Sequence, residues 1–144
     1  MRKTFKHNLL PVIDIEDKII DGKRFYFLPD GRKFPSVTTV IGQKLPKGEG
    51  LVKRREKVGD EKADAILKEA SRRGTAVHDL AEKYVLNEEN YKGDHRVLDV
   101  ATFGDLKRML ENHVDNILGV EFPLYNVALN TAGRGDLFAQ FDGV

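Results

Sequence analysis

The sequence contains no cysteine among its 144 residues. Disulfide bonds and zinc sites built on thiolates are therefore excluded, and a reducing compartment fits this composition without being required by it. No apolar run approaches the roughly 18 residues that span a membrane, and Met1-Arg2-Lys3-Thr4 is not followed by the apolar core of a signal peptide. We expect a cytoplasmic protein.

A strong net charge is also absent, because 24 Lys and Arg residues face 23 Asp and Glu residues. Apolar residues make up 40% of the chain and charged residues 33%, which is typical of one soluble, ordered domain of this length. Near-neutrality of the whole does not exclude nucleic acid, because phosphate binding depends on local positive potential. Residues 44–73 are locally basic, with Lys44, Lys47, Lys53, Arg54, Arg55, Lys57, Lys62, Lys68, Arg72 and Arg73.

The pattern along the chain predicts an α+β fold with strands at both ends, and we find no internal repeat. Residues 1–10 are basic and irregular and predict a loose arm. Residues 15–28 predict a β-hairpin around Asp21-Gly22, a dipeptide typical of tight turns. Near the C-terminus, residues 120–125 and 136–141 predict two more strands, separated by a turn at residues 132–135.

The middle of the chain predicts helices. Ser36 is a natural N-cap for a short helix that ends at Gly42, although the adjacent threonines leave a strand as the competitor. A basic helix follows over residues 51–58. A further helix begins near Asp60, with Gly74 either interrupting it or allowing a close approach by another backbone or a ligand. Residues 97–118 predict one long helix, with Gly119 as its C-cap.

Residues 70–86 (ASRRGTAVHDLAEKYVL) contain the most informative pattern. His78 and Glu82 are four apart, so they share one helix face and can look out together towards a metal ion or towards each other. Val77, Leu80, Ala81, Tyr84 and Val85 supply the buried side of the same helix. Such a pair is also common as an ordinary surface pair, and the spacing alone does not decide between the two.

Two further acidic residues can join this pair. Glu121 starts a predicted strand, and Asp136 follows the glycine-flanked Gly133-Arg134-Gly135. One nitrogen ligand with one or two carboxylates suits Mg²⁺ or Mn²⁺, the ions that organise phosphate and water for phosphodiester hydrolysis. The alternative is that Glu121 and Asp136 are exposed, solvated carboxylates.

The same pieces, in this order, resemble the RecB-like branch of the PD-(D/E)XK nuclease superfamily, especially phage exonucleases and the related mitochondrial genome-maintenance exonuclease. The matching pieces are residues 34–41 (FPSVTTVI), residues 72–78 (RRGTAVH) with Glu82, then Glu121, and residues 133–136 (GRGD). The resemblance implies an incomplete restriction-endonuclease-like core, DNA as the substrate, and roles in DNA recombination and repair.

The resemblance also implies roles for individual residues. His78 and Asp136 would hold Mg²⁺ or Mn²⁺, and Glu82 and Glu121 correspond to acidic positions that support the site. Charge and position make four further residues candidates for phosphate contacts: Ser36, Arg54, Arg72 and Arg73. For a phage-encoded protein, the expected location is the cytoplasm of the host cell.

The family pattern continues with a strand that carries (Asp/Glu)-x-Lys, and this motif is not found after Asp136. The chain contains no lysine after Lys107, so no later residue can replace the lysine of that motif. We therefore expect the N-terminal part of a metal-dependent DNA exonuclease, inactive unless a further segment or a second chain completes the site.

Two other hypotheses stay open at this point. The chain can be a non-catalytic nucleic-acid-binding or inhibitory module derived from a nuclease, or a small α+β domain with an ordinary charged surface. The partner expected under the first two hypotheses is DNA, as single strands or DNA ends. The strand at residues 136–141 can also present an unpaired edge, which predicts a homodimer through this strand.

Overall fold

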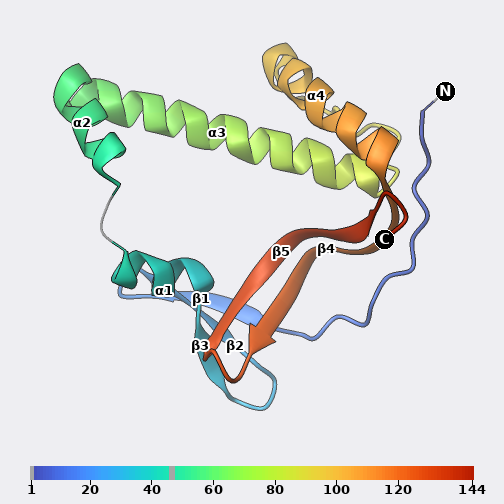
Figure 1. Ribbon diagram of the computed structural model, residues 1–144, viewed down its shortest axis with the longest axis horizontal. Helices are drawn as coiled ribbons and strands as arrows, with labels where there is room; N and C mark the ends of the chain where they lie inside the picture. Colours follow the sequence, from blue (N-terminus) through green and yellow to red (C-terminus); the bar gives the residue numbers. More distant parts are fainter. Residues whose placement is uncertain (1, 46–47) are drawn as a thin grey trace. The chain divides into compact units, whose positions relative to one another are not determined.

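The computed structural model describes residues 2–45 and 48–144, and it confirms an α+β fold with strands at both ends and helices between them (Figure 1). The elements in order are β1 (Glu16–Ile20), β2 (Lys23–Phe27), β3 (Lys33–Pro35), α1 (Val37–Lys44), α2 (Glu49–Val58), α3 (Asp60–Val85), α4 (Val97–His113), β4 (Val114–Asn126) and β5 (Thr131–Phe141). None of the described helices is both long enough and apolar enough to cross a membrane.

Contacts within the chain divide it into two compact units, and the strands β4 and β5 run through both. The first unit comprises Met1–Leu10, Val58–Glu121 and Asp136–Val144, and the second comprises Pro11–Lys57 and Phe122–Gly135. The expectation of one domain over the whole chain stays a prediction.

In the second unit, β1, β2 and β3 form an antiparallel sheet in that order. The predicted hairpin is confirmed: Asp21 and Gly22 have φ angles of 51° and 73° and close a two-residue loop between Ile20 and Lys23. Positive φ at both positions is what a type I′ turn requires. Alternate residues of β2 and β3 face a small core made of Ile15, Tyr26, Leu28, Phe34 and Ala132, with Tyr125 packed against it.

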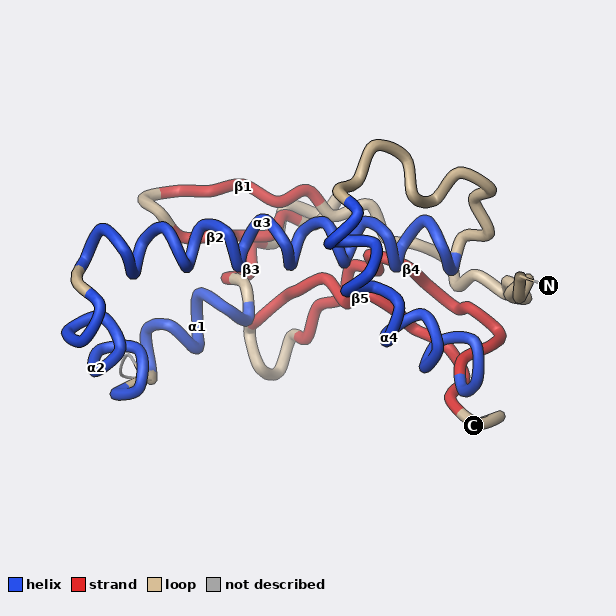
Figure 2. The backbone as a smooth tube through the Cα atoms, turned by 90° about the horizontal axis from the view of Figure 1, so that it is seen from above, coloured by secondary structure: helices blue, strands red, loops and turns tan. Residues whose placement is uncertain are grey.

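The first unit is built on α3 and α4, which pack against each other (Figures 1 and 2). Helix α3 runs without a break from Asp60 to Val85, so Gly74 does not interrupt it. Tyr84 is fully buried at the centre of this unit, and the rings of Phe5, Tyr91 and Phe103 pack edge-on against its ring. The Tyr84 hydroxyl donates a hydrogen bond to the carboxylate of Glu111 on α4.

The N-terminal segment is not the loose arm that its sequence predicts. Phe5 is only 2% exposed and belongs to the core of the first unit. The segment also pairs in parallel with β4, through hydrogen bonds between Ile117 N and Lys6 O at 2.7 Å and between Asn8 N and Ile117 O at 2.9 Å. The guanidinium of Arg2 lies 4.7 Å from the centre of the Tyr84 ring. A segment with a basic, irregular composition is therefore docked on β4 through an isolated β-bridge and its flanking hydrogen bonds.

Two predicted boundaries in the C-terminal third are wrong. The long helix ends at His113 rather than at residue 118, and Gly119 lies inside β4 instead of capping a helix. The Gly-Arg-Gly run at residues 133–135 is extended and belongs to β5, and the turn that precedes it covers residues 127–130. This turn has no glycine. It is closed by hydrogen bonds from Leu129 N to the Asn126 side chain and from Asn130 N to Val127 O.

We expect Phe5→Ala to lower the free energy of unfolding by about 3–5 kcal/mol, because it opens a cavity beside Tyr84. Leu9→Ala is the control, since Leu9 is 60% exposed and its truncation should change stability by no more than about 0.5 kcal/mol. Urea denaturation followed by circular dichroism measures both. Equal stabilities for the two variants would show that the N-terminal segment is not docked.

Candidate functional site

A pocket in the first unit brings together the four acidic and imidazole side chains that the sequence predicts to converge. His78 and Glu82 come from α3, Glu121 from β4 and Asp136 from β5, and all four line a pocket of about 230 Å³. His78 Nδ1 lies 3.6 Å from Asp136 Oδ2. Residues that are far apart in sequence thus converge on one small volume.

The other residues that line this pocket are apolar, and they surround His78 and Glu82, the two polar residues of α3 in the lining. The apolar lining comes from Val77, Ala81, Val85, Leu106, Met109, Leu110, Val120 and Leu137. The side chains of His78 and Asp136 are 60% and 67% exposed, so both remain open to a solute. The pocket therefore has an apolar base and a polar, accessible rim.

Glu82 differs from an ordinary surface glutamate. Burial raises the pKa of Glu82 above its usual value, and the negative charge of Glu121 raises it further. Two carboxylates that repel each other beside an imidazole form an arrangement that a cation or a shared proton would stabilise. The negative charges of Glu82 and Glu121 therefore repel each other across the pocket.

Glu121 also has an unusual backbone conformation, with a φ angle of 47° in the middle of β4. A glutamate in the left-handed region costs on the order of 1–3 kcal/mol unless the surrounding structure holds it there. The burial pattern of β4 is irregular here, since Val120 and Glu121 are both partly buried and Phe122 and Pro123 are both buried. In this conformation the Glu121 side chain lines the pocket, and the sequence does not predict the conformation.

The donor set fits a hard divalent cation in part. Imidazole nitrogen and carboxylate oxygens are acceptable ligands for Mn²⁺ and Mg²⁺, and His78 and Asp136 are already neighbours. In residues 2–45 and 48–144, however, no three His, Asp or Glu side chains are placed closely enough to form a ready ligand set. Binding an ion would require Glu82 or Glu121 to change rotamer towards the His78–Asp136 pair.

Two of the predicted phosphate contacts are engaged elsewhere. Ser36 is 3% exposed, and its hydroxyl accepts the hydrogen bond from Thr39 N at 3.0 Å that caps α1. The guanidinium of Arg72 donates two hydrogen bonds to Asp99, at 2.8 and 3.0 Å, and two more to Glu69. Because Asp99 is 1% exposed, Arg72 chiefly ties α4 to α3.

The other two candidates have different outcomes. Arg73 is half-exposed and comes within 3.8 Å of Glu69. Its Nε is buried without a hydrogen-bond partner among the described residues. The backbone of Arg54 belongs to α2, but its side chain lies outside the described part of the structure. Arg73 is not among the described residues that line the His78 pocket.

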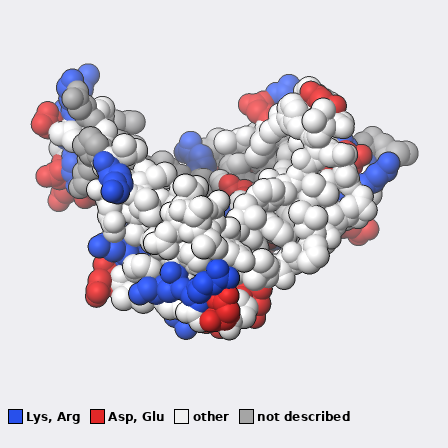
Figure 3. Space-filling model, turned by 60° about the horizontal axis from the view of Figure 1, so that its bottom comes forward, with Lys and Arg blue, Asp and Glu red and all other residues white. Residues whose placement is uncertain are grey.

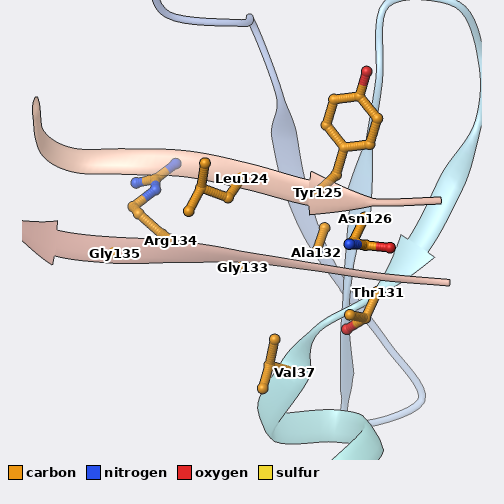
Figure 4. A pocket seen from close by; sticks show the side chains of 9 residues that line it. All are labelled: Val37, Leu124, Tyr125, Asn126, Thr131, Ala132, Gly133, Arg134 and Gly135. Carbon is orange, nitrogen blue, oxygen red and sulfur yellow. The ribbon is translucent and has the colours of Figure 1, made fainter. Parts of the chain in front are cut away.

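A second pocket lies in the second unit, between α1 and the adjoining ends of β4 and β5, which point in opposite directions (Figure 4). Its volume is about 390 Å³. Gly133 packs here against Val37, while Arg134 and Leu124 stand on neighbouring strands and form one side of the pocket. Arg134 is 3.9 Å from Asp17, so its charge is partly balanced. The Gly-Arg-Gly run thus packs an extended strand against a helix.

Comparisons with protein-family models, with curated proteins and with solved structures found no match for this chain. The nuclease resemblance therefore stays a prediction that rests on the motifs and on the convergence of His78, Glu82, Glu121 and Asp136.

The Arg72–Asp99 pair predicts a loss of stability in acid. Arg72 holds the pKa of Asp99 below its ordinary value, so the pair contributes fully above about pH 4 and its contribution is lost as the pH falls further. Asp99→Asn should lower the free energy of unfolding at pH 7, because it leaves Arg72 without its carboxylate partner, and should flatten the stability profile below pH 4. Urea unfolding across this pH range measures both effects, with Asp94→Asn, in an exposed loop position, as the control. A profile with the wild-type slope in Asp99→Asn would contradict the assignment.

Removal of the Glu121 charge should lower the pKa of Glu82. In Glu121→Gln the like-charge repulsion disappears, whereas burial, the larger cause, remains. We therefore expect the pKa to fall part of the way to its usual value. Carbon-13 NMR titration of the glutamate carboxyl groups reports this directly. Glu88→Gln is the matched control, since its charge contributes less to the shift than that of Glu121. If the pKa of Glu82 did not change in Glu121→Gln, the inference that the Glu121 charge raises it would be contradicted.

Proposed function

We propose that this chain provides the metal-binding part of a DNA exonuclease, a hydrolase that cleaves phosphodiesters with Mg²⁺ or Mn²⁺. The observation that carries the proposal is the convergence of His78 and Asp136, 3.6 Å apart, in one pocket with Glu82 and Glu121. These are the residues to which the nuclease resemblance assigns metal binding and its acidic support.

In this proposal His78 and Asp136 hold the ion, and Glu121 or Glu82 turns towards it as a further oxygen donor. A bound divalent ion supplies charge to neutralise the scissile phosphate and lowers the pKa of a water molecule. The chain's own part is to place the donors and to manage protons. Burial raises the pKa of Glu82 and the Glu121 charge raises it further, so Glu82 holds a proton more readily than an ordinary glutamate does.

The apolar base of the pocket supports the same function. Leu106, Met109 and Leu110 of α4 and Val77 of α3 exclude water from one side of the polar rim. Electrostatic interactions strengthen when water is displaced, so the carboxylates would hold a divalent ion more strongly here than in open solvent. The described residues that line the pocket include no lysine. The lysine expected from the family pattern would therefore come from a further segment or from a second chain.

A non-catalytic nucleic-acid-binding module is the second candidate, and one observation favours it. The described side chains contain no ready group of three metal ligands, so the pocket can exist without supporting hydrolysis. Metal binding and cleavage must therefore be measured separately.

Metal binding has a matched control in the same unit. We expect His78→Ala and Asp136→Asn each to weaken Mn²⁺ binding by about tenfold or more, the loss that even outer-shell partners of a metal site produce. His113 and Asp142 form another exposed histidine–aspartate pair, 2.8 Å apart, so His113→Ala and Asp142→Asn should leave binding unchanged. Electron paramagnetic resonance of free Mn²⁺ gives the affinity. The metal site would be contradicted if variants of both pairs lost Mn²⁺ affinity equally, or if variants of neither pair lost any.

Cleavage is assayed on end-labelled single-stranded and duplex DNA with Mn²⁺ and, as a blank, with EDTA. The chain is tested alone and together with any adjoining segment that carries an (Asp/Glu)-x-Lys motif. Cleavage that disappears in His78→Ala and persists in His113→Ala supports the exonuclease. Mn²⁺ binding at His78 without cleavage in either preparation favours the binding module.

A further inference from the structure

The two faces of the sheet β1–β2–β3 differ in kind. Tyr26 and Phe34 are buried on one face, where they meet the core of the second unit. On the other face, Phe25 and Phe27 are only half-buried, and they lie two residues apart on the central strand. Since residues i and i+2 of a strand point to the same side, both rings belong to a single surface.

Lysines surround these rings. Lys33 Nζ lies 4.6 Å from the centre of the Phe25 ring, and Lys18 Nζ lies 5.3 Å from the centre of the Phe27 ring. Lys18 is opposite Phe25 in the ladder and Lys33 is opposite Phe27, so each ammonium reaches diagonally across the sheet. Lys23 is exposed on the same face. We call the set Lys18, Lys23, Phe25, Phe27 and Lys33 the aromatic–lysine face.

The charge on this face is predominantly positive. Among the described strand residues that share this face, Glu16 is the one acid, and it pairs with Lys18 at 3.1 Å in an exposed contact. An exposed ion pair of this kind contributes little and yields readily to another anion. Figure 3 shows a band of Lys and Arg side chains at the lower part of the view, with Asp and Glu side chains beside it.

We propose that the aromatic–lysine face binds single-stranded nucleic acid, with bases stacked on Phe25 and Phe27 and phosphates held by Lys18, Lys23 and Lys33. Aromatic rings that alternate with cations on an open sheet match the two chemical parts of such a strand. The lysine ammonium groups now lie over the rings through weak, exposed cation–π contacts, and their long stems allow them to swing to a phosphate as a base takes their place.

The geometry favours a single strand over a duplex. Two residues of a strand span about 7 Å, whereas stacked bases in one strand of a duplex are about 3.4 Å apart. Bases on adjacent rings must therefore separate from one another, which a paired and stacked duplex does not allow. Apart from its lysines and Glu16, the strand residues of this face offer no hydrogen-bonding side chain, so we expect tolerance of sequence and of the sugar, with DNA and RNA both bound.

This inference goes beyond the proposed function and does not depend on it, because the face contains no metal ligand pair. Binding is measured in EDTA, by fluorescence anisotropy of labelled oligothymidylate and oligouridylate, with the whole chain. Phe25→Leu/Phe27→Leu keeps the apolar bulk but removes both aromatic rings. It should weaken binding by about tenfold or more, the effect expected even from the loss of one base–aromatic stack. Phe141→Leu, which removes a half-exposed ring elsewhere, is the matched control and should bind as the wild type does.

The lysines are tested through the salt dependence of binding. Lys18→Gln/Lys33→Gln should lower the slope of log affinity against log salt by about 1.4, at about 0.7 for each phosphate contact on a single strand. Lys68→Gln, on the exposed surface of α3, should leave the slope unchanged. Circular dichroism and thermal melting establish that each variant is folded, so that a loss of binding is not a loss of structure.

The position is tested by photocrosslinking with an oligonucleotide that contains 5-iodouracil, which reacts with aromatic side chains stacked on it. Trypsin cuts after Arg24 and Arg32, so a single peptide, residues 25–32, carries both rings. Crosslinks in this peptide, absent from the leucine double variant, support the inference. Crosslinks only in other peptides overturn it, and so do wild-type affinity in the double variant and binding to anionic vesicles in preference to oligonucleotide. Loss of Mn²⁺ binding in His78→Ala with intact strand binding would separate the two proposals.

Discussion

The burial of Tyr84 is the interaction on which the first unit depends. Its ring contacts the N-terminal segment through Phe5, the α3–α4 loop through Tyr91 and α4 through Phe103. Its hydroxyl donates to Glu111, so burial raises the Tyr84 pKa without leaving the hydroxyl unpaired. A side chain held on every side fixes the rotation of α3 about its own axis. That rotation in turn places His78 and Glu82 at the border between the buried stripe and solvent, beside β5.

Sequence reasoning succeeded where the controlling interactions are local. The Asp21-Gly22 turn, the Ser36 cap and the apolar stripe of α3 each depend on residues within a few positions of one another, and each is present. It failed where a partner lies far along the chain. The N-terminal segment becomes ordered because β4 supplies hydrogen-bond partners at Ile117, and no local pattern in residues 1–10 encodes that pairing. The same applies to the β-branched start of β4, where pairing overrides the helical periodicity that precedes it.

The candidate site likewise has features that the sequence predicted and features that it did not. The order of the motifs was enough to predict that His78 and Asp136 lie close together. The nuclease resemblance expects a histidine on a helix and an aspartate on a late strand, and both motifs can be found in the sequence. The left-handed conformation of Glu121 was not predictable, because a positive φ is uncommon for residues other than glycine and nothing in the residue itself favours it. The raised pKa of Glu82 is likewise a product of burial and of a neighbour on another element. Both features appear only when helix and strand are assembled.

The positive charge of a segment and the positive charge available to a ligand are different quantities in this protein. Residues 44–73 contain the densest basic run, yet Arg72 is held by Asp99 and Glu69, and Arg73 reaches the same Glu69. Those charges are largely balanced within the fold and stabilise the packing of α4 on α3. The sheet of the second unit has fewer cations, but Lys33 lies over an aromatic ring instead of a carboxylate and keeps its charge for an incoming anion. A surface for nucleic acid is therefore better sought where cations meet aromatic rings than where the sequence is most basic.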